Sequence, residues 1–241
     1  MSELSRSEKL HINLIEIISD ADPGQQLPSE PALAEELGVS RATLREAMRT
    51  FETQGFLRRR QGVGTFVVRP TQVIESGLEV LESIETLSDR IGLPVSMGEF
   101  QMVDCDADDV IAQKLTIEKG SKVQCISRVI VADDRPVAFL VDTIRAGLLA
   151  PDAIGANFTG SVLDLLLKRG IPVLEHSRCE INAVAATSEV ARALDIQRGD
   201  SVLRFESLLY SIEGEPIDYS FSYFLPGYFK FHVVRRVGNG L

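Results

Sequence analysis

Apolar residues in the first quarter of the chain recur at the spacing of amphipathic helices. The pattern predicts three helices, over residues 7–19, 30–37 and 41–54. The turn Asp22-Pro23-Gly24 ends the first helix, Ser29 is a good N-cap for the second, and Gly38 ends it. The residues predicted to face the core are Leu10, Leu14, Ile17 and Ile18, then Leu33, Ala34 and Leu37, then Leu44, Ala47, Met48 and Phe51.

The second and third helices are separated by a very short turn. Only Val39 lies between Gly38 and Ser40, the predicted N-cap of the third helix. Two short helices joined by a tight turn with glycine are typical of a helix-turn-helix. The polar face of the third helix carries Thr43 and an arginine at every fourth position: Arg41, Arg45 and Arg49. Arginine binds guanine edges and phosphates, but a solvated basic face on an ordinary helix is the alternative.

A predicted hairpin after the third helix favours DNA binding over that alternative. Residues 56–60 and 65–68 alternate as strands, and the tip between them, Gln61-Gly62-Val63-Gly64, contains two glycines. Glycines at a tip let the backbone approach another molecule closely. A helix-turn-helix followed by such a hairpin is a winged helix-turn-helix.

The charge distribution agrees with a local DNA-binding surface. The 241 residues carry a net charge of −10, which alone argues against a nucleic-acid partner. Residues 41–69, however, contain seven arginines against Glu46 and Glu52, a local net charge of +5. Phosphate attraction requires positive charge at the interface and not over the whole protein.

The remainder of the chain contains an internal repeat with an offset of 79 residues. Residues 107–123 reappear as residues 186–202, and each copy continues as strand, acidic turn, proline and strand. Each copy predicts a helix, a tight turn and an antiparallel hairpin, so the two together predict a pseudo-symmetric antiparallel sheet with helices, an α+β fold. Further helices are predicted over residues 74–90 and from Ser161 to Gly170. We divide the chain into a DNA-binding domain (1–69), a linker (70–77) and a second domain (78–241).

The N-terminal motifs closely resemble those of the GntR family of bacterial repressors. The matching segments are Leu27-Pro28-Ser29-Glu30, Gly38-Val39-Ser40-Arg41, Thr43-Leu44-Arg45-Glu46-Ala47, Gly55-Phe56-Leu57 and Gly62-Val63-Gly64-Thr65-Phe66-Val67. By this resemblance Ser40, Arg41, Thr43 and Arg45 match operator-contacting positions, Arg49 extends the same face, and Gln61, Gly62 and Gly64 match a wing tip at the minor groove. One departure is Pro31, where the family often has a basic residue that can contact DNA.

The second domain resembles the UTRA effector-binding domain, which defines the HutC branch of that family. The resemblance implies that Arg128 binds an anionic part of the effector, that Ser161 holds an anion at a helix start, and that Asp218 takes hydroxyls or an amine. Two positions depart from the sugar-phosphate binders of the family. Ile130 replaces a second arginine, and Leu140 replaces a carboxylate for which Asp142 could substitute. A phosphorylated sugar is therefore less expected than in those relatives.

These patterns predict a cytoplasmic homodimer that binds double-stranded operator DNA and an unidentified small-molecule effector, with no cofactor, no metal and no membrane partner. No apolar run is long enough to span a membrane, and Cys105, Cys125 and Cys179 show no metal-binding spacing. Two alternatives stay open: a DNA-targeted α+β enzyme, and a constitutive DNA-binding protein without effector. The enzyme is disfavoured because the sequence shows no nucleophile elbow, phosphate-binding loop or metal cluster.

Overall fold

The computed structural model describes residues 5–53, 55–60, 62–68, 73–149, 158 and 160–235. The chain divides into two compact units, one extending to Val73 and the other starting at Ile74, with Pro226–Tyr228 grouped with the first. The helices are α1 (Arg6–Asp20), α2 (Glu30–Glu36), α3 (Arg41–Thr53), α4 (Ile84–Ile91), α5 (Asp109–Leu115), α6 (Val162–Arg169) and α7 (Ser188–Ala193). The strands are β1 (Leu57–Arg60), β2 (Gly64–Val67), β3 (Ile74–Gly77), β4 (Val95–Asp106), β5 (Lys122–Ala132), β6 (Arg135–Arg145), β7 (Leu174–Ala185), β8 (Ser201–Ser211), β9 (Pro216–Phe224) and β10 (Phe229–His232).

The first unit contains the three predicted helices and the predicted hairpin. Ser5 caps α1 in a capping box with Glu8, and Ser29 caps α2 by accepting from the Ala32 amide. Strands β1 and β2 pair antiparallel, with Leu57 opposite Val67. One core joins all five elements and contains Leu10, Leu14, Ile18, Leu33, Leu44, Met48, Phe51, Leu57 and Val67. The predicted helix-turn-helix and wing are confirmed.

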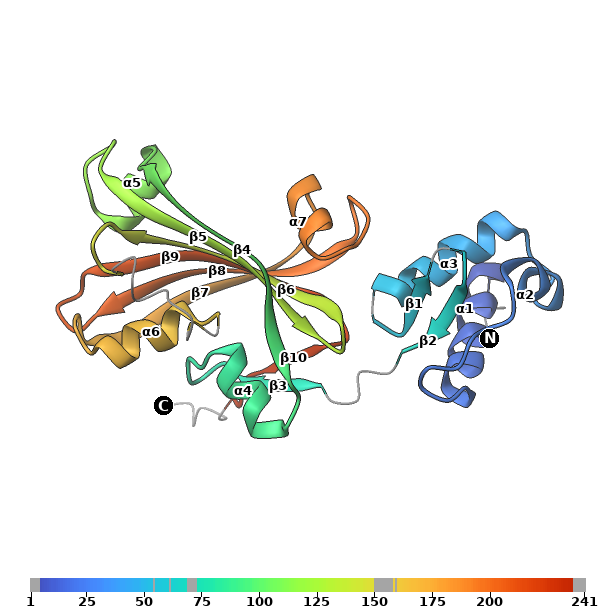
Figure 1. Cartoon of the computed structure of the whole chain (residues 1–241). Coiled ribbons are helices and arrows are strands. Elements are labelled where there is room, and N and C mark those ends of the chain that lie inside the picture. The colour runs from blue at the N-terminus through green and yellow to red at the C-terminus, as the bar shows by residue number, and fades with distance from the viewer. Residues whose placement is uncertain are drawn as a thin grey trace, which may run out of the picture. The chain divides into compact units, whose positions relative to one another are not determined.

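The second unit is built on one antiparallel six-stranded sheet in the order β4-β5-β6-β9-β8-β7. The order is palindromic, because β4-β5-β6 and β7-β8-β9 are the two copies of the repeat and meet at the β6–β9 pair. Figure 1 shows α5 and α7 against one face of this sheet and α4 and α6 on the other. The predicted α+β fold is confirmed.

The repeat is longer than the sequence pattern first indicates. Strands β4 and β7 are equivalent at the same offset of 79 residues, and α4 and α6 are equivalent at 78. Each of these two helices begins after a serine N-cap, Ser83 and Ser161, and ends at a left-handed glycine, Gly92 and Gly170. Both copies therefore read helix, long strand, short helix and hairpin.

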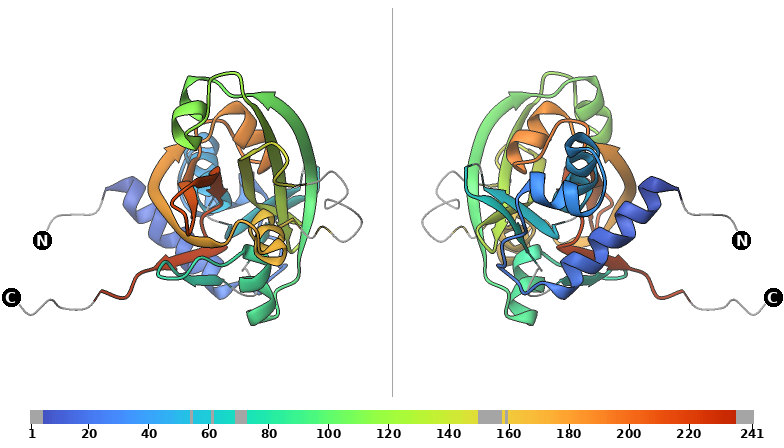
Figure 2. Two further views of the ribbon diagram at one scale, coloured as in Figure 1. Left: turned by 90° about the vertical axis from the view of Figure 1, so that its left-hand side faces the viewer. Right: turned by 90° about the vertical axis from the view of Figure 1, so that its right-hand side faces the viewer.

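The predicted helix over residues 74–90 is wrong for its first ten residues. Ile74–Gly77 forms β3, which pairs in parallel with β10 so that Ile74 lies opposite Phe229. In Figure 2 the ribbon can be followed by its colours, with β10 in the red segment near the C-terminus. The spacing of Ile74 and Leu78 fits one face of a helix and therefore misled the prediction. In the structure Ile74 is buried in a strand, whereas Leu78 is exposed. Helix α4 starts at Ile84, where the Ser83 hydroxyl accepts from the Thr86 amide at 3.0 Å. Strand β3 thus lies inside the segment predicted as a linker.

Candidate functional site

The start of α3 presents a polar, exposed surface. The Thr43 amide donates to Ser40 Oγ at 3.1 Å, so Ser40 caps the helix as predicted. Ser40, Arg41, Thr43 and Arg45 are exposed, whereas Leu44 and Met48 are buried in the core on the opposite face. This helix start can therefore enter a DNA groove without disturbing the packing of the unit.

Glu30 at the start of α2 links the third helix to the wing. Its carboxylate accepts from Arg45 at 2.8 Å and pairs with Arg59 at 2.7 Å, while its own side chain is 14% exposed. The hydrogen bond from Arg45 lowers the pKa of Glu30 below its ordinary value, with Arg59 adding a smaller effect. Arg49 lies 3.7 Å from Glu46. Arg45 is thus held by a carboxylate of the same unit.

The wing tip has free space around Gly62 and is bonded to Gln26 through Val63. Gly62 has φ +75°, and a Cβ placed on it would meet nothing within 4 Å. Gln26 Nε2 donates to the Val63 carbonyl at 2.8 Å, which connects the tip to the segment before α2. Gly64, the first residue of β2, also has a positive φ. Gln61, predicted as part of the same tip, lies outside the described residues.

The second unit contains a cavity of about 560 Å³ that is lined by residues of the sheet, of α4 and of α6. This volume lies within the usual range of small-molecule sites. All four residues predicted to bind an effector, Arg128, Asp142, Ser161 and Asp218, line it, and each is at most 7% exposed. They come from β5, β6, the N-cap of α6 and β9.

The sheet register explains why the charged residues meet. On β6, Asp142 lies opposite Ser220 of β9, and its neighbour on the same face, Ile144, lies opposite Asp218. Arg128 on β5 is opposite Leu140 and donates through Nη1 to Asp142. An arginine and two aspartates from three adjacent strands are therefore grouped on one face of the sheet.

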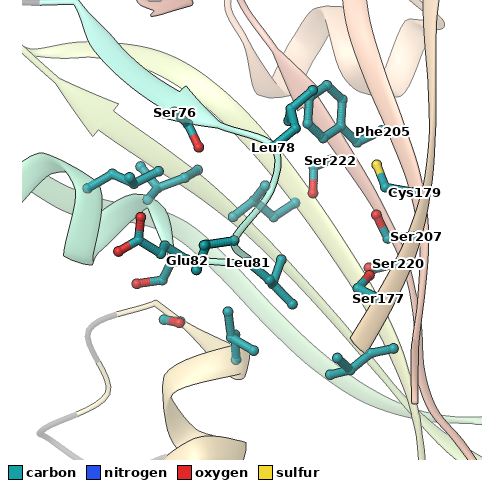
Figure 3. Close-up of a pocket in the computed structure, with 18 of the residues that line it drawn as sticks. Ser76, Leu78, Leu81, Glu82, Ser177, Cys179, Phe205, Ser207, Ser220 and Ser222 are labelled. Carbon is teal, nitrogen blue, oxygen red and sulfur yellow. The ribbon is translucent and has the colours of Figure 1, made fainter. Parts of the chain in front are cut away.

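Serine side chains cover the neighbouring wall of the cavity. Ser177, Ser207, Ser220 and Ser222 line it from β7, β8 and β9, together with Cys179 and Phe205 (Figure 3). Leu78 and Leu81, from the segment between β3 and α4, line the cavity as well (Figure 3). The cavity thus offers both hydroxyls and exposed apolar groups.

Two cavity carboxyl groups are hard to ionise. Burial raises the pKa of Asp218 well above its ordinary value; the charge of Asp142 and a hydrogen bond with it raise it further, and Arg128 opposes both. Burial also raises the pKa of Glu85, in the first turn of α4. Asp218 Oδ1 and Glu85 Oε1 are buried without a hydrogen-bond partner. Such atoms bind a donor readily when a ligand supplies one.

Glu85 and the four serines are cavity residues that the sequence reasoning missed. The signal for Glu85 was present, because Ser83 and Gly92-Leu93-Pro94 repeat as Ser161 and Gly170-Ile171-Pro172. Extending the repeat to these helices would have placed Glu85 in the first turn of a helix whose start is equivalent to that of α6. The serines carry no comparable pattern.

Other features of the described residues bear on partners and cofactors. No cluster of His, Cys, Asp or Glu that could hold a metal ion occurs in the part of the chain that the structure describes. Within those same residues, no helix is both long and apolar enough to cross a membrane.

An exposed basic helix start with a wing, and a separate α+β unit with a polar cavity, define a DNA-binding regulator that responds to a small molecule. Residues 14–67 match the family described as bacterial regulatory proteins, gntR family, and residues 101–230 match the UTRA domain. The chain belongs to the gntR family and carries a UTRA domain as its second unit.

Individual relatives agree with this assignment. The chain is 30% identical over 221 residues to the transcriptional repressor NagR of Bacillus subtilis, covering 90% of this chain and 89% of that protein. It is 30% identical over 215 residues to the mannosyl-D-glycerate system repressor MngR of Escherichia coli, and the match covers 89% of this chain and 88% of MngR. The crystal structure of PhnF from Mycobacterium smegmatis shares the fold, with a TM-score of 0.65, 22% identity and coverage of 95% and 100%.

Family membership decides between the readings that the sequence left open. The gntR family consists of DNA-binding regulators, so the chain is a transcriptional regulator and not a DNA-targeted enzyme. The UTRA domain gives it an effector-binding domain, which a constitutive DNA-binding protein would lack.

Proposed function

We propose that the chain represses transcription in the cytoplasm as a homodimer and that a small molecule in the UTRA cavity releases its operator. Each protomer places the start of α3 in the major groove of one half-site, with the wing tip at the adjacent minor groove. The effector contacts Arg128, Asp142, Ser161 and Asp218. The observation that carries the proposal is the presence, in one chain, of an exposed basic helix start and a polar cavity in separate units.

Repression and dimerisation have separate support. NagR, MngR and a histidine utilization repressor of Pseudomonas putida, 29% identical over 184 residues, are all named as repressors. A single helix-turn-helix reads a short half-site, so proteins of this type pair about a two-fold axis on sites one helical turn apart. Release requires that the effector bind the DNA-free arrangement of the dimer more tightly than the DNA-bound one.

The test is fluorescence anisotropy with DNA from the region upstream of the protein's own gene. Arg41→Ala and Arg45→Ala are compared with the wild type and with Lys119→Ala, which removes one exposed cation from the second unit. We expect each α3 variant to weaken specific binding by roughly 10- to 100-fold, since a guanine contact by arginine contributes about 1–3 kcal/mol. Lys119→Ala should bind like the wild type. If the α3 variants also bind like the wild type, the proposed DNA surface is wrong.

A further inference from the structure

The innermost ionisable groups of the cavity are three carboxyl groups and one guanidinium. Asp142 and Asp218 lie on the sheet, Glu85 lies in the first turn of α4, and Arg128 is the cation among them. Arg128 and Asp142 are bonded to each other, with side chains 6% and 10% exposed, so their charges largely cancel. Asp218 and Glu85 remain, each with a buried oxygen that has no hydrogen-bond partner.

Glu85 lies beside the residue that precedes the start of α6. Gly160 precedes the N-cap Ser161, and a Cβ built on Gly160 would be 2.8 Å from Glu85 Oε1. The partial positive charge of a helix start attracts anions. Here a carboxyl group of the protein itself lies beside that helix start, so an incoming phosphate would meet an acceptor group where it needs a donor or a cation.

An apolar side chain fills the adjacent position. Ile130 lies two residues after Arg128 on the same face of β5 and is 1% exposed. Its Cδ1 atom would lie 3.5 Å from the Cβ built on Gly160. Among the described residues that line the cavity, Arg128 and His176 are the only basic side chains. His176 Nδ1 lies 3.0 Å from a carboxylate oxygen of Glu175, so Arg128 has no second free cation beside it to bind an anion. Burying a phosphate without cations to pair it is strongly unfavourable.

We infer that the effector of this cavity carries a positively charged nitrogen, such as a protonated amine, and no phosphate, and that this nitrogen donates to Asp218 or Glu85. An ammonium group has hydrogens to donate and no acceptor, which matches two unpartnered carboxyl oxygens. Hydroxyls such as those of Ser220 and Ser222 can accept from the same group or bind polar parts of the effector, and Leu78 and Leu81 can cover an apolar part. The inference rests on the proposed effector role of the cavity and names the charge of its ligand.

The experiment measures thermal unfolding of the full chain in ethylammonium chloride, sodium chloride and sodium phosphate at equal ionic strength. Ethylammonium is a fragment small enough to reach either carboxyl group whatever the rest of the effector is. The variants Asp218→Asn and Glu85→Gln remove one carboxyl group each, and Arg128→Gln removes the cation. Glu213→Gln, in the exposed turn before β9, is the matched control.

We expect ethylammonium to raise the Tm of the wild type and of Glu213→Gln above its value in sodium chloride, by about 3 °C at ten times the Kd. The rise in ethylammonium should be lost or at least halved in Asp218→Asn or in Glu85→Gln. Any general salt effect of phosphate should be the same in the wild type and in Arg128→Gln. A phosphate-specific rise that disappears in Arg128→Gln would overturn the inference while keeping the cavity as the effector site. Ethylammonium and sodium shifts that are equal in the wild type would also overturn it; the regulatory role is then tested separately by operator binding.

Discussion

The Ser83 hydroxyl donates a 2.7 Å hydrogen bond to the carboxylate of Asp164, and this bond joins the starts of α4 and α6. The two helices are equivalent in the internal repeat, and each begins at a buried serine. In the first copy the serine accepts from the Thr86 amide and also reaches the first turn of the other helix. In the second copy Ser161 accepts from the Asp164 amide at 2.9 Å. The repeat thereby brings two helix starts to one wall of the cavity.

The bond between Ser83 and Asp164 should contribute to stability beyond helix capping. Ser83→Ala removes a cap and the partner of Asp164, so we expect a loss of about 1–2 kcal/mol in the free energy of unfolding. A double-mutant cycle with Asp164→Asn, followed by urea denaturation, measures the coupling, which we expect to be at least about 0.5 kcal/mol. Additive single effects would show that the two helix starts are energetically independent.

Glu30 should restrain the DNA affinity of the free regulator. Glu30→Gln removes the charge that holds Arg45 and Arg59, so both arginines become available to phosphates. We expect tighter non-specific DNA binding and a steeper salt dependence, by about one unit in the slope of log K against log salt for each phosphate gained. Titrations at several salt concentrations measure this slope. Glu35→Gln, an exposed carboxylate of the same helix, is the control, and equal effects of both substitutions would contradict the restraining role.

Asp218 should make stability depend on pH. Its pKa is raised in the folded protein above the ordinary value of 3.8, so the folded state binds this proton more tightly than the unfolded state does. The resulting stabilisation is complete at low pH and is lost as the pH rises through the folded pKa. We therefore expect Asp218→Asn to be more stable than the wild type near pH 8 and to lose less stability between pH 5 and 8.

Urea denaturation across that pH range provides the measurement. The groups facing Asp218 are Asp142, Arg128 and Ser220. Burial also raises the pKa of Glu85, so some pH dependence of stability should remain in Asp218→Asn. Glu213→Gln should follow the wild type. A variant curve parallel to that of the wild type would mean that Asp218 ionises in the folded protein as easily as in the unfolded chain.

Filling the cavity should separate effector response from DNA binding. Ser220→Phe places a ring in the serine wall, where about 560 Å³ is available, so overpacking should be modest. We expect unchanged operator affinity and loss of operator release by a metabolite extract that releases the wild type. Ser201→Phe, at the exposed start of β8, is the control. Release that persists in Ser220→Phe would place the effector elsewhere.

The sequence predicted those parts of the fold in which local pattern and tertiary packing agree. In the first unit, N-caps such as Ser29 and Ser40 agree with the apolar spacing of the helices that they start. In the second unit, the hairpins were predicted because their sequence pattern occurs twice at a constant offset. Strand β3 was missed because its stability depends on β10, which lies about 155 residues later, and no local signal reports such a partner. Long-range pairing of this kind overrides helical spacing.

The candidate effector residues show the same division. Arg128, Asp142, Ser161 and Asp218 were selected by family resemblance, and the structure places them around one cavity, although their contact with an effector stays a prediction. Glu85 was missed because the repeat was not extended to α4 and α6, and because its proximity to the start of α6 arises from packing of two helices that are far apart in sequence. The contacts of Arg41, Arg45 and Gly62 with DNA likewise remain predictions.

The repeat also has a consequence for how many molecules the cavity holds and which way they face. Equivalent positions in the two copies are chemically different. Arg128 on β5 corresponds to Ser207 on β8 at the offset of 79, and Asp142 on β6 corresponds to Ser222 on β9 at an offset of 80, which aligns Pro136 with Pro216. A duplicated protein with identical halves would offer a ligand two interchangeable poses about the pseudo-axis. Here the first copy contributes an ion pair and the second contributes hydroxyls and Asp218, so a ligand turned about the pseudo-axis would meet different groups. Each protomer should therefore hold one molecule in a single orientation, at a stoichiometry of one.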